Sequence, residues 1–170
     1  MRILNILILL AVSLSFNSCG VKVSYGFTGA DTGDAETFQV NFFQNQAAII
    51  EPGIDLKFTN DLQDIIVNQT SLELVTSNAD LIYEGEIVQY FISPITATAQ
   101  STAAQNRLTI GVQVRFYNKL DETKDLEQRF SFYFDFDGDA NLTGSRRDQV
   151  IEEIYLRLTQ DIFNATLARW

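Results

Sequence analysis

The chain has 170 residues, of which 46% are hydrophobic and 20% charged, and its formal net charge at pH 7 is −10. This size and balance suit one globular domain with a real core, and the negative charge argues against nucleic acid and anionic membrane surfaces as partners. The chain contains no histidine, so it lacks the usual general base and the commonest metal ligand. We therefore expect a protein that is not an enzyme and that holds no metal and no cofactor.

The first residues have the order of a secretory signal. A basic start at Arg2 is followed by an apolar run that is too short to span a bilayer stably, and small residues close it. Cys19 is the only cysteine of the chain and is followed by Gly20. This arrangement resembles the lipobox of bacterial lipoproteins, although Phe16 stands where many lipoboxes carry leucine. The resemblance implies that residues 1–18 are removed and that Cys19 carries a covalent lipid.

A lipidated Cys19 predicts where the mature chain resides. Acyl chains contribute about 0.8 kcal/mol per buried methylene, which holds a protein on a membrane. Residues 20–26 lack the acidic run that, in Bacteroidetes-like lipoproteins, tends to mark export to the cell surface. We expect a lipidated tether over residues 19–36 and a single domain over residues 37–170, on the periplasmic side of the outer membrane. With one cysteine, that domain has no internal disulfide.

The pattern of apolar residues in the first half of the domain predicts a strand, a helix and a second strand. Phe38, Val40 and Phe42 alternate with polar residues, which is typical of a half-buried strand. Pro52 suits the first turn of a helix. Apolar residues then recur at helical spacing for about four turns, at Ile54, Phe58, Leu62, Ile65 and Ile66. Residues 72–75 form a short extended piece, and a less regular strand over residues 81–92 is expected to stop at Ser93 and Pro94.

The second half predicts two clear strands and a helix. Apolar and polar residues alternate over residues 107–118 and 126–136, and the short polar link between them favours an antiparallel hairpin. Such alternation predicts one packed face and one wet face. Ser145 and Asp148 resemble a capping box that opens a long amphipathic helix, which is expected to end near Trp170.

This element order predicts an α+β fold. The simplest way to bury every apolar stripe is a two-layer sandwich, with two helices packed on one face of a sheet in the order β-α-β-β-β-α. The first helix can serve as a right-handed crossover between parallel strands, so the sheet is expected to be mixed but mostly antiparallel.

Three arginines are the candidate contacts for a ligand or partner. Arg107 and Arg115 share the wet face of one predicted strand, and Arg129 lies on the wet face of its neighbour. Three guanidinium groups on one face could bind phosphate or carboxylate groups bidentately. They could equally pair with Glu127 or other acids as surface charge.

Three weaker motifs favour structural interpretations. Residues 135–141 resemble a calcium loop, but the glycine and the last ligand are misplaced, which favours a solvated turn. Glu84 and Glu86 share a strand face like paired catalytic carboxylates, yet no pocket is evident, which favours an exposed or edge strand kept soluble by charge. The aromatic stripe over residues 130–136 indicates core, rather than a groove for acyl chains.

Several stretches together resemble the lipopolysaccharide-assembly outer-membrane lipoprotein family (LptE) in its Bacteroidetes-like form. They are residues 19–20, 25–29, 38–43, 84–87, 106–110 and 160–164. The resemblance implies a lipoprotein that plugs a large outer-membrane β-barrel, helps it assemble and helps it pass lipopolysaccharide to the cell surface. Because the chain is acidic, we expect it to act mainly as a plug and assembly partner. The alternative is a periplasmic-facing lipoprotein that binds a small or lipidic ligand.

Overall fold

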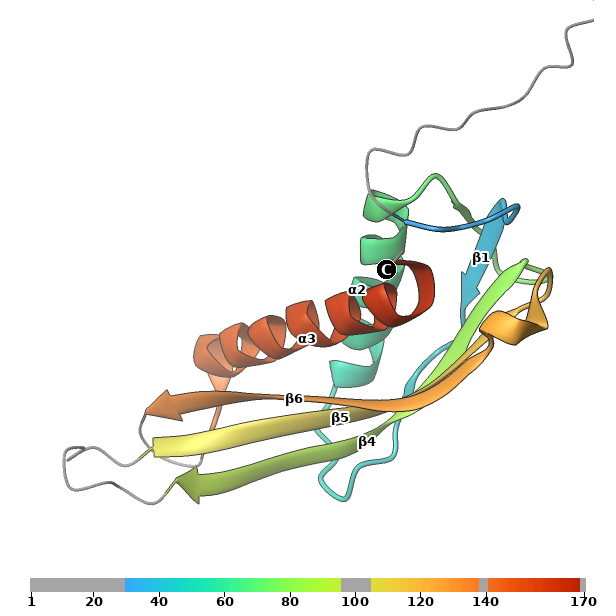
Figure 1. The fold of residues 1–170 in the computed structure, drawn as a ribbon. Helices are drawn as coiled ribbons and strands as arrows, with labels where there is room; N and C mark the ends of the chain where they lie inside the picture. The colour runs from blue at the N-terminus through green and yellow to red at the C-terminus, as the bar shows by residue number, and fades with distance from the viewer. Residues whose placement is uncertain (1–29, 96–104, 138–140, 169–170) are drawn as a thin grey trace, which may run out of the picture.

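The computed structural model describes residues 30–95, 105–137 and 141–168, in which a six-stranded sheet carries two helices on one side (Figure 1). The elements in chain order are β1 (Thr37–Val40), β2 (Gln44–Asn45), α2 (Ile54–Gln69), β3 (Glu73–Leu74), β4 (Leu81–Ile95), β5 (Gln105–Asn118), the 3₁₀ turn η2 (Glu122–Lys124), β6 (Leu126–Asp137) and α3 (Gly144–Leu167). This arrangement confirms the predicted α+β fold, with two helices over a mixed sheet that does not close.

The sheet combines a parallel part and an antiparallel part. Its order is β3-β1-β4-β5-β6, and β2 pairs with β4 beyond the end of β1. β1 runs parallel to both β3 and β4, while β4, β5 and β6 form an antiparallel meander. Helix α2 lies in the connection between the parallel strands β1 and β4, which confirms the mixed sheet. The short strands β2 and β3 add to the predicted order.

The core lies between the sheet and the helices. The inward residues of β5 are all buried, namely Leu108, Ile110, Val112, Val114 and Phe116. The Phe58 ring on α2 contacts Phe43 and Tyr155 edge-to-face, at centroid distances of 5.1 and 5.2 Å. The three rings join the chain after β1 to α2 and α3, so aromatic packing holds the two layers together.

The aromatic stripe of β6 belongs to this core. Phe130 and Phe136 are buried, and Phe132 and Phe134 are partly buried against the same cluster. The prediction that residues 130–136 form core is therefore confirmed.

Strand β4 is longer and less regular than predicted. It continues through Ser93 and Pro94 to Ile95, so the expected stop was wrong. Proline is tolerated there because, among the described residues, β4 has a neighbour only on its β5 side beyond Ile87, and an edge position loses no ladder bond. A register shift between Ile87 and Gln89 accounts for the weak alternation.

Both predicted helix starts were also wrong by a short distance. Helix α2 begins at Ile54 after Gly53, whose φ of 82° places Pro52 in the turn outside the helix. Helix α3 begins after Thr143, which makes no side-chain cap bond. Asp148 instead accepts hydrogen bonds from Arg147, so no capping box forms. Within the described part of the chain, neither helix is long and apolar enough to cross a membrane.

Candidate functional site on the open face of the sheet

The face of the sheet away from the helices carries the candidate arginines. Both helices cover the opposite face (Figure 1), so alternate side chains of β4, β5 and β6 point away from the core. Register brings them into rows across the strands: Glu84, Arg115 and Glu127 form one row, and Glu86, Gln113 and Arg129 form the next. Opposite charges in such rows stabilise a sheet by short-range pairing.

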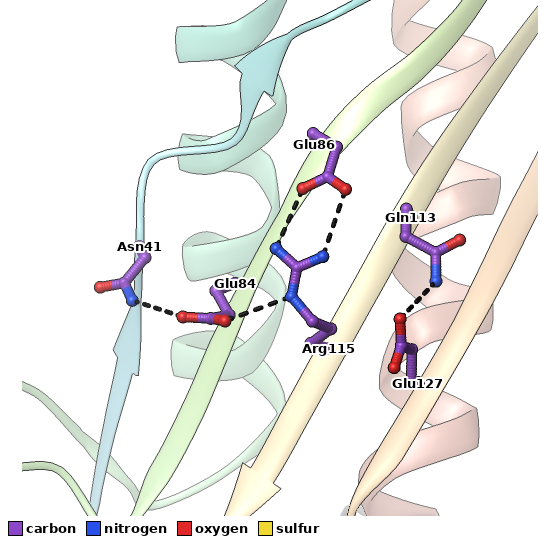
Figure 2. Close-up of polar contacts among 6 residues, drawn as sticks. All are labelled: Asn41, Glu84, Glu86, Gln113, Arg115 and Glu127. Atoms are coloured by element: carbon purple, nitrogen blue, oxygen red, sulfur yellow. Dashed lines mark hydrogen bonds and ion pairs between the residues drawn. The ribbon is translucent and has the colours of Figure 1, made fainter.

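Arg115 lies at the centre of a polar cluster with Glu84, Glu86 and Asn41, which Figure 2 shows. Its Nη1 and Nη2 donate to the two carboxylate oxygens of Glu86 at 3.2 and 3.0 Å, and its Nε donates to Glu84 Oε1 at 3.2 Å. Asn41 Nδ2 donates to the other oxygen of Glu84 at 3.4 Å. Hydrogen bonds to Glu86 and Glu84 raise the pKa of Arg115, so this guanidinium stays charged and bridges two carboxylates.

Arg129 lies in a different setting from Arg115. Its Nη2 donates to Gln89 Oε1 at 2.6 Å and lies 3.2 Å from the position that a β-carbon on Gly111 would occupy. Glu127, one of the acids that the sequence offered as alternative partners for the arginines, accepts from Gln113 Nε2 at 3.4 Å (Figure 2). The partner of Arg129 is therefore a neutral amide.

Arg107 forms a separate ion pair near the N-terminal end of β5. Its Nε and Nη2 donate to Asp135 Oδ1 and Oδ2 at 2.7 and 2.9 Å. Its guanidinium carbon lies 3.7 Å from the centroid of the Tyr133 ring, which adds a cation–π contact. The hydrogen bond from Arg107 holds the pKa of Asp135 below its usual value.

Each candidate arginine thus already contacts a side chain of the same sheet, and contact with an external ligand stays a prediction. Glu84 and Glu86 share one face as predicted, and both side chains are partly exposed. At this point β4 has neighbours on both sides, β1 as far as Tyr83 and β2 at Glu86 on one side and β5 on the other. Of the predicted exposed or edge strand, the edge alternative was therefore wrong. The sequence singled out Arg115 and the two glutamates separately but did not predict their pairing. No sequence motif reveals the strand register that places Arg115 opposite Glu84.

Replacing Arg115 by glutamine is expected to lower the free energy of unfolding by about 1 kcal/mol, a value that allows for solvent screening of partly exposed charges. The change leaves Glu84 and Glu86 close together without a cation, so high salt is expected to reduce the loss. Urea unfolding at low and high salt measures both effects. Arg157→Gln is the matched control, because Arg157 on α3 is exposed. Equal losses in the two variants would contradict the bridging role of Arg115.

The Arg107–Asp135 pair predicts a pH-dependent stability. Because pairing lowers the folded-state pKa of Asp135, the pair stabilises the fold above the unfolded pKa, and this contribution is lost as pH falls through the folded value. We expect Arg107→Gln to be less stable than the wild type near neutral pH, and the gap to narrow below pH 3.8. Thermal unfolding of both proteins from neutral pH to below pH 3.8 measures this difference in stability. A difference that widens in acid would refute the stabilising role of the Arg107–Asp135 pair.

The remaining candidates from the sequence are Cys19 and the calcium-like loop over residues 135–141, and the structure describes them only in part. Cys19 and residues 138–140 of the calcium-like loop lie outside the described residues. Asp135 at the start of that loop is bound by Arg107. Among the described residues, no group of three or more acidic or cysteine side chains is placed to hold a metal ion.

Comparison with known families identifies the class of the protein. Residues 35–166 match the family described as LptE: Lipopolysaccharide-assembly, so the match spans most of the chain and covers the sheet and both helices. This match assigns the chain to the class of lipopolysaccharide-assembly proteins. The chain belongs to the LptE family.

Solved structures with a related arrangement are distant. The hypothetical protein CT253 from Chlamydia trachomatis is 7% identical over 78% of this chain and 98% of that chain, with a TM-score of 0.49. The PelC dodecamer from Paraburkholderia phytofirmans is 10% identical over 82% and 95%, with a TM-score of 0.48. Rare lipoprotein B from Shewanella oneidensis is 10% identical over 75% and 89%, with a TM-score of 0.40. No curated protein sequence matches, and likenesses this distant carry no functional argument.

Proposed function

We propose that this chain is a non-enzymatic lipoprotein of the outer membrane that partners with and plugs a large β-barrel translocon for lipopolysaccharide assembly at the cell surface. The family match over residues 35–166 is the observation that carries the proposal. The lipobox at Cys19 supports a lipid anchor on the periplasmic side, with a tether over residues 19–36 leading to the domain over residues 37–170.

The open face of the sheet suits a protein that sits in a polar lumen. Such a protein needs one packed side and one side whose charges and amides hydrogen-bond without a hydrophobic partner. Arg115 and Arg107 are neutralised by carboxylates on neighbouring strands, so this face offers hydrogen bonds without a large excess of positive charge. Together with the net charge of −10, this supports a plug and assembly partner over a protein that binds lipopolysaccharide phosphates through its arginines.

The same contacts support the absence of catalysis. Glu84 and Glu86, the one carboxylate pair that the sequence suggested, are bridged by Arg115 and are therefore held as ion-pair partners. Turnover of a substrate by the purified protein, abolished by Glu84→Gln, would overturn this part of the proposal.

The test is co-purification. The tagged, lipidated protein is isolated from detergent-solubilised outer membrane, and the accompanying proteins are identified by mass. We expect a single large β-barrel protein in near-equal amount. A protein that comes out alone would refute the plug and favour the alternative, a lipoprotein that binds a small or lipidic ligand.

Replacing Cys19 by alanine is expected to abolish palmitate labelling, because the thiol that accepts the lipid is removed. Membrane fractionation is expected to shift the variant toward the soluble fraction, since an acyl anchor is lost. Ser18→Ala is the matched control, because it changes a neighbouring residue and leaves the thiol in place. Labelling that survives Cys19→Ala would refute the anchor.

A further inference from the structure

Strand β6 presents a long edge. It runs over Leu126–Asp137, and among the described residues it pairs only with β5. It contains no proline, and Arg129 is its single basic residue. Short strands, lysines and prolines usually protect an edge from pairing. Among the described residues, the opposite side of the sheet ends in the two-residue strand β3 and, beyond Ile87, in the part of β4 that contains Pro94. The outer N–H and C=O groups of β6 are therefore open to another strand.

A cleft of about 680 Å³ lies beside this edge, between β6 and α3. Figure 1 shows β6 as the outermost strand on the side of α3. The apolar part of the cleft is formed by Phe134, Phe136, Val150 and Leu156. The Leu156 residue is 59% exposed, so an apolar contact surface on α3 is left uncovered next to the outer edge of β6.

The polar lining of the cleft is acidic. It holds one guanidinium, that of Arg146, and four carboxylates, which belong to Asp135, Asp137, Glu152 and Glu153. Asp135 is neutralised by Arg107, and the Arg146 guanidinium carbon lies 5.9 Å from the centroid of the Phe136 ring. The remaining carboxylates outnumber the cation, so the cleft favours a positively charged occupant.

We propose that the edge of β6 binds an extended polypeptide segment as an added strand, whose alternate side chains enter the β6–α3 cleft. Main-chain hydrogen bonds give affinity in such strand addition, and pockets for every second side chain give specificity. The apolar walls and acidic lining select a segment in which apolar residues alternate with lysine or arginine. A second copy of this chain is disfavoured, because each copy carries a net charge of −10. This interface shares Asp135 with the open face of the sheet, but it does not depend on the proposed function.

The probe is a fluorescent peptide of about ten residues, the upper end of usual strand lengths, in which valine and lysine alternate. Its binding to the full-length lipidated protein in non-ionic detergent is measured by anisotropy. We expect Leu156→Lys to weaken binding about tenfold, because an apolar contact is lost and a like charge is added. Leu56→Lys is the matched control, since Leu56 is 56% exposed on α2 and lies outside the cleft; it is expected to bind like the wild type.

Two further measurements separate strand addition from simple charge attraction. A fully N-methylated version of the peptide is expected not to bind, because it cannot donate main-chain hydrogen bonds. Hydrogen exchange is expected to slow at alternate amides of β6 when the unmodified peptide binds. No binding of the unmodified peptide, equal binding to Leu156→Lys and wild type, or binding of the N-methylated peptide would each overturn the proposal. Exchange at β6 that slows with protein concentration alone would assign the edge to a second copy and overturn it as well.

Discussion

Phe58→Ala is expected to lower the free energy of unfolding by about 4 kcal/mol, the usual range for deleting a buried phenylalanine ring. Phe58 is fully buried on α2 and makes edge-to-face contacts with Phe43 and Tyr155. Its removal takes away both ring contacts and leaves a cavity where α2, α3 and the chain after β1 meet. Urea unfolding followed by circular dichroism measures the loss.

Phe42→Ala is the matched control for this variant. Phe42 precedes Phe43 in the chain but is 51% exposed, so its truncation is expected to cost less than about 1 kcal/mol. The two changes remove the same number of atoms and differ in burial. A loss of similar size in both variants would show that the Phe43–Phe58–Tyr155 cluster is not the centre of the core.

Gly85→Ala is expected to cost about 3 kcal/mol, at the upper end for added volume in a packed site. A β-carbon at Gly85 would lie 2.0 Å from the backbone oxygen of Gln113 and 2.7 Å from Cε1 of Phe43. The backbone oxygen belongs to β5, the strand that pairs with β4, so it cannot retreat without disturbing the sheet. Thermal and urea unfolding measure the loss of stability.

Gly111→Ala is the control within the same sheet. A β-carbon there would meet the Arg129 guanidinium at 3.2 Å and Gln89 Cβ at 3.2 Å. Because the guanidinium ends a flexible side chain, we expect a cost of about 1 kcal/mol or less. If Gly111→Ala were as destabilising as Gly85→Ala, the backbone contact at Gly85 would not be the cause.

The position of Gly85 also explains a short stretch that contributed to the family resemblance. In residues 84–87, Glu84 and Glu86 point to the open face and bind Arg115, Ile87 is buried in the core, and Gly85 lets the Phe43 ring approach β4. One stretch therefore serves the polar face and the aromatic core at once. No catalytic role is needed to account for its composition.

Local sequence patterns were enough to predict the class of fold and the family. Alternation over β5 and β6 and helical spacing over α2 and α3 are local properties of the chain, since a strand repeats every two residues and a helix every 3.6. These patterns predicted a mixed sheet with two helices, which the structure confirms. The order of these stretches also carried the resemblance to the LptE family, which the match over residues 35–166 shows. The pattern around Cys19 that resembles a lipobox is likewise local, and lipidation of Cys19 stays a prediction.

Which side chains contact one another follows from the three-dimensional arrangement of the elements and could not be predicted from the sequence. The bridge from Arg115 to Glu84 and Glu86 depends on the register between β4 and β5, and that register shifts between Ile87 and Gln89. The start of helix α2 depends on the backbone conformation of Gly53, whose φ of 82° keeps Pro52 outside the helix. The open edge of β6 and its cleft depend on where α3 lies over the sheet. These features join residues far apart in sequence, and local periodicity contains no information about distances between separate elements.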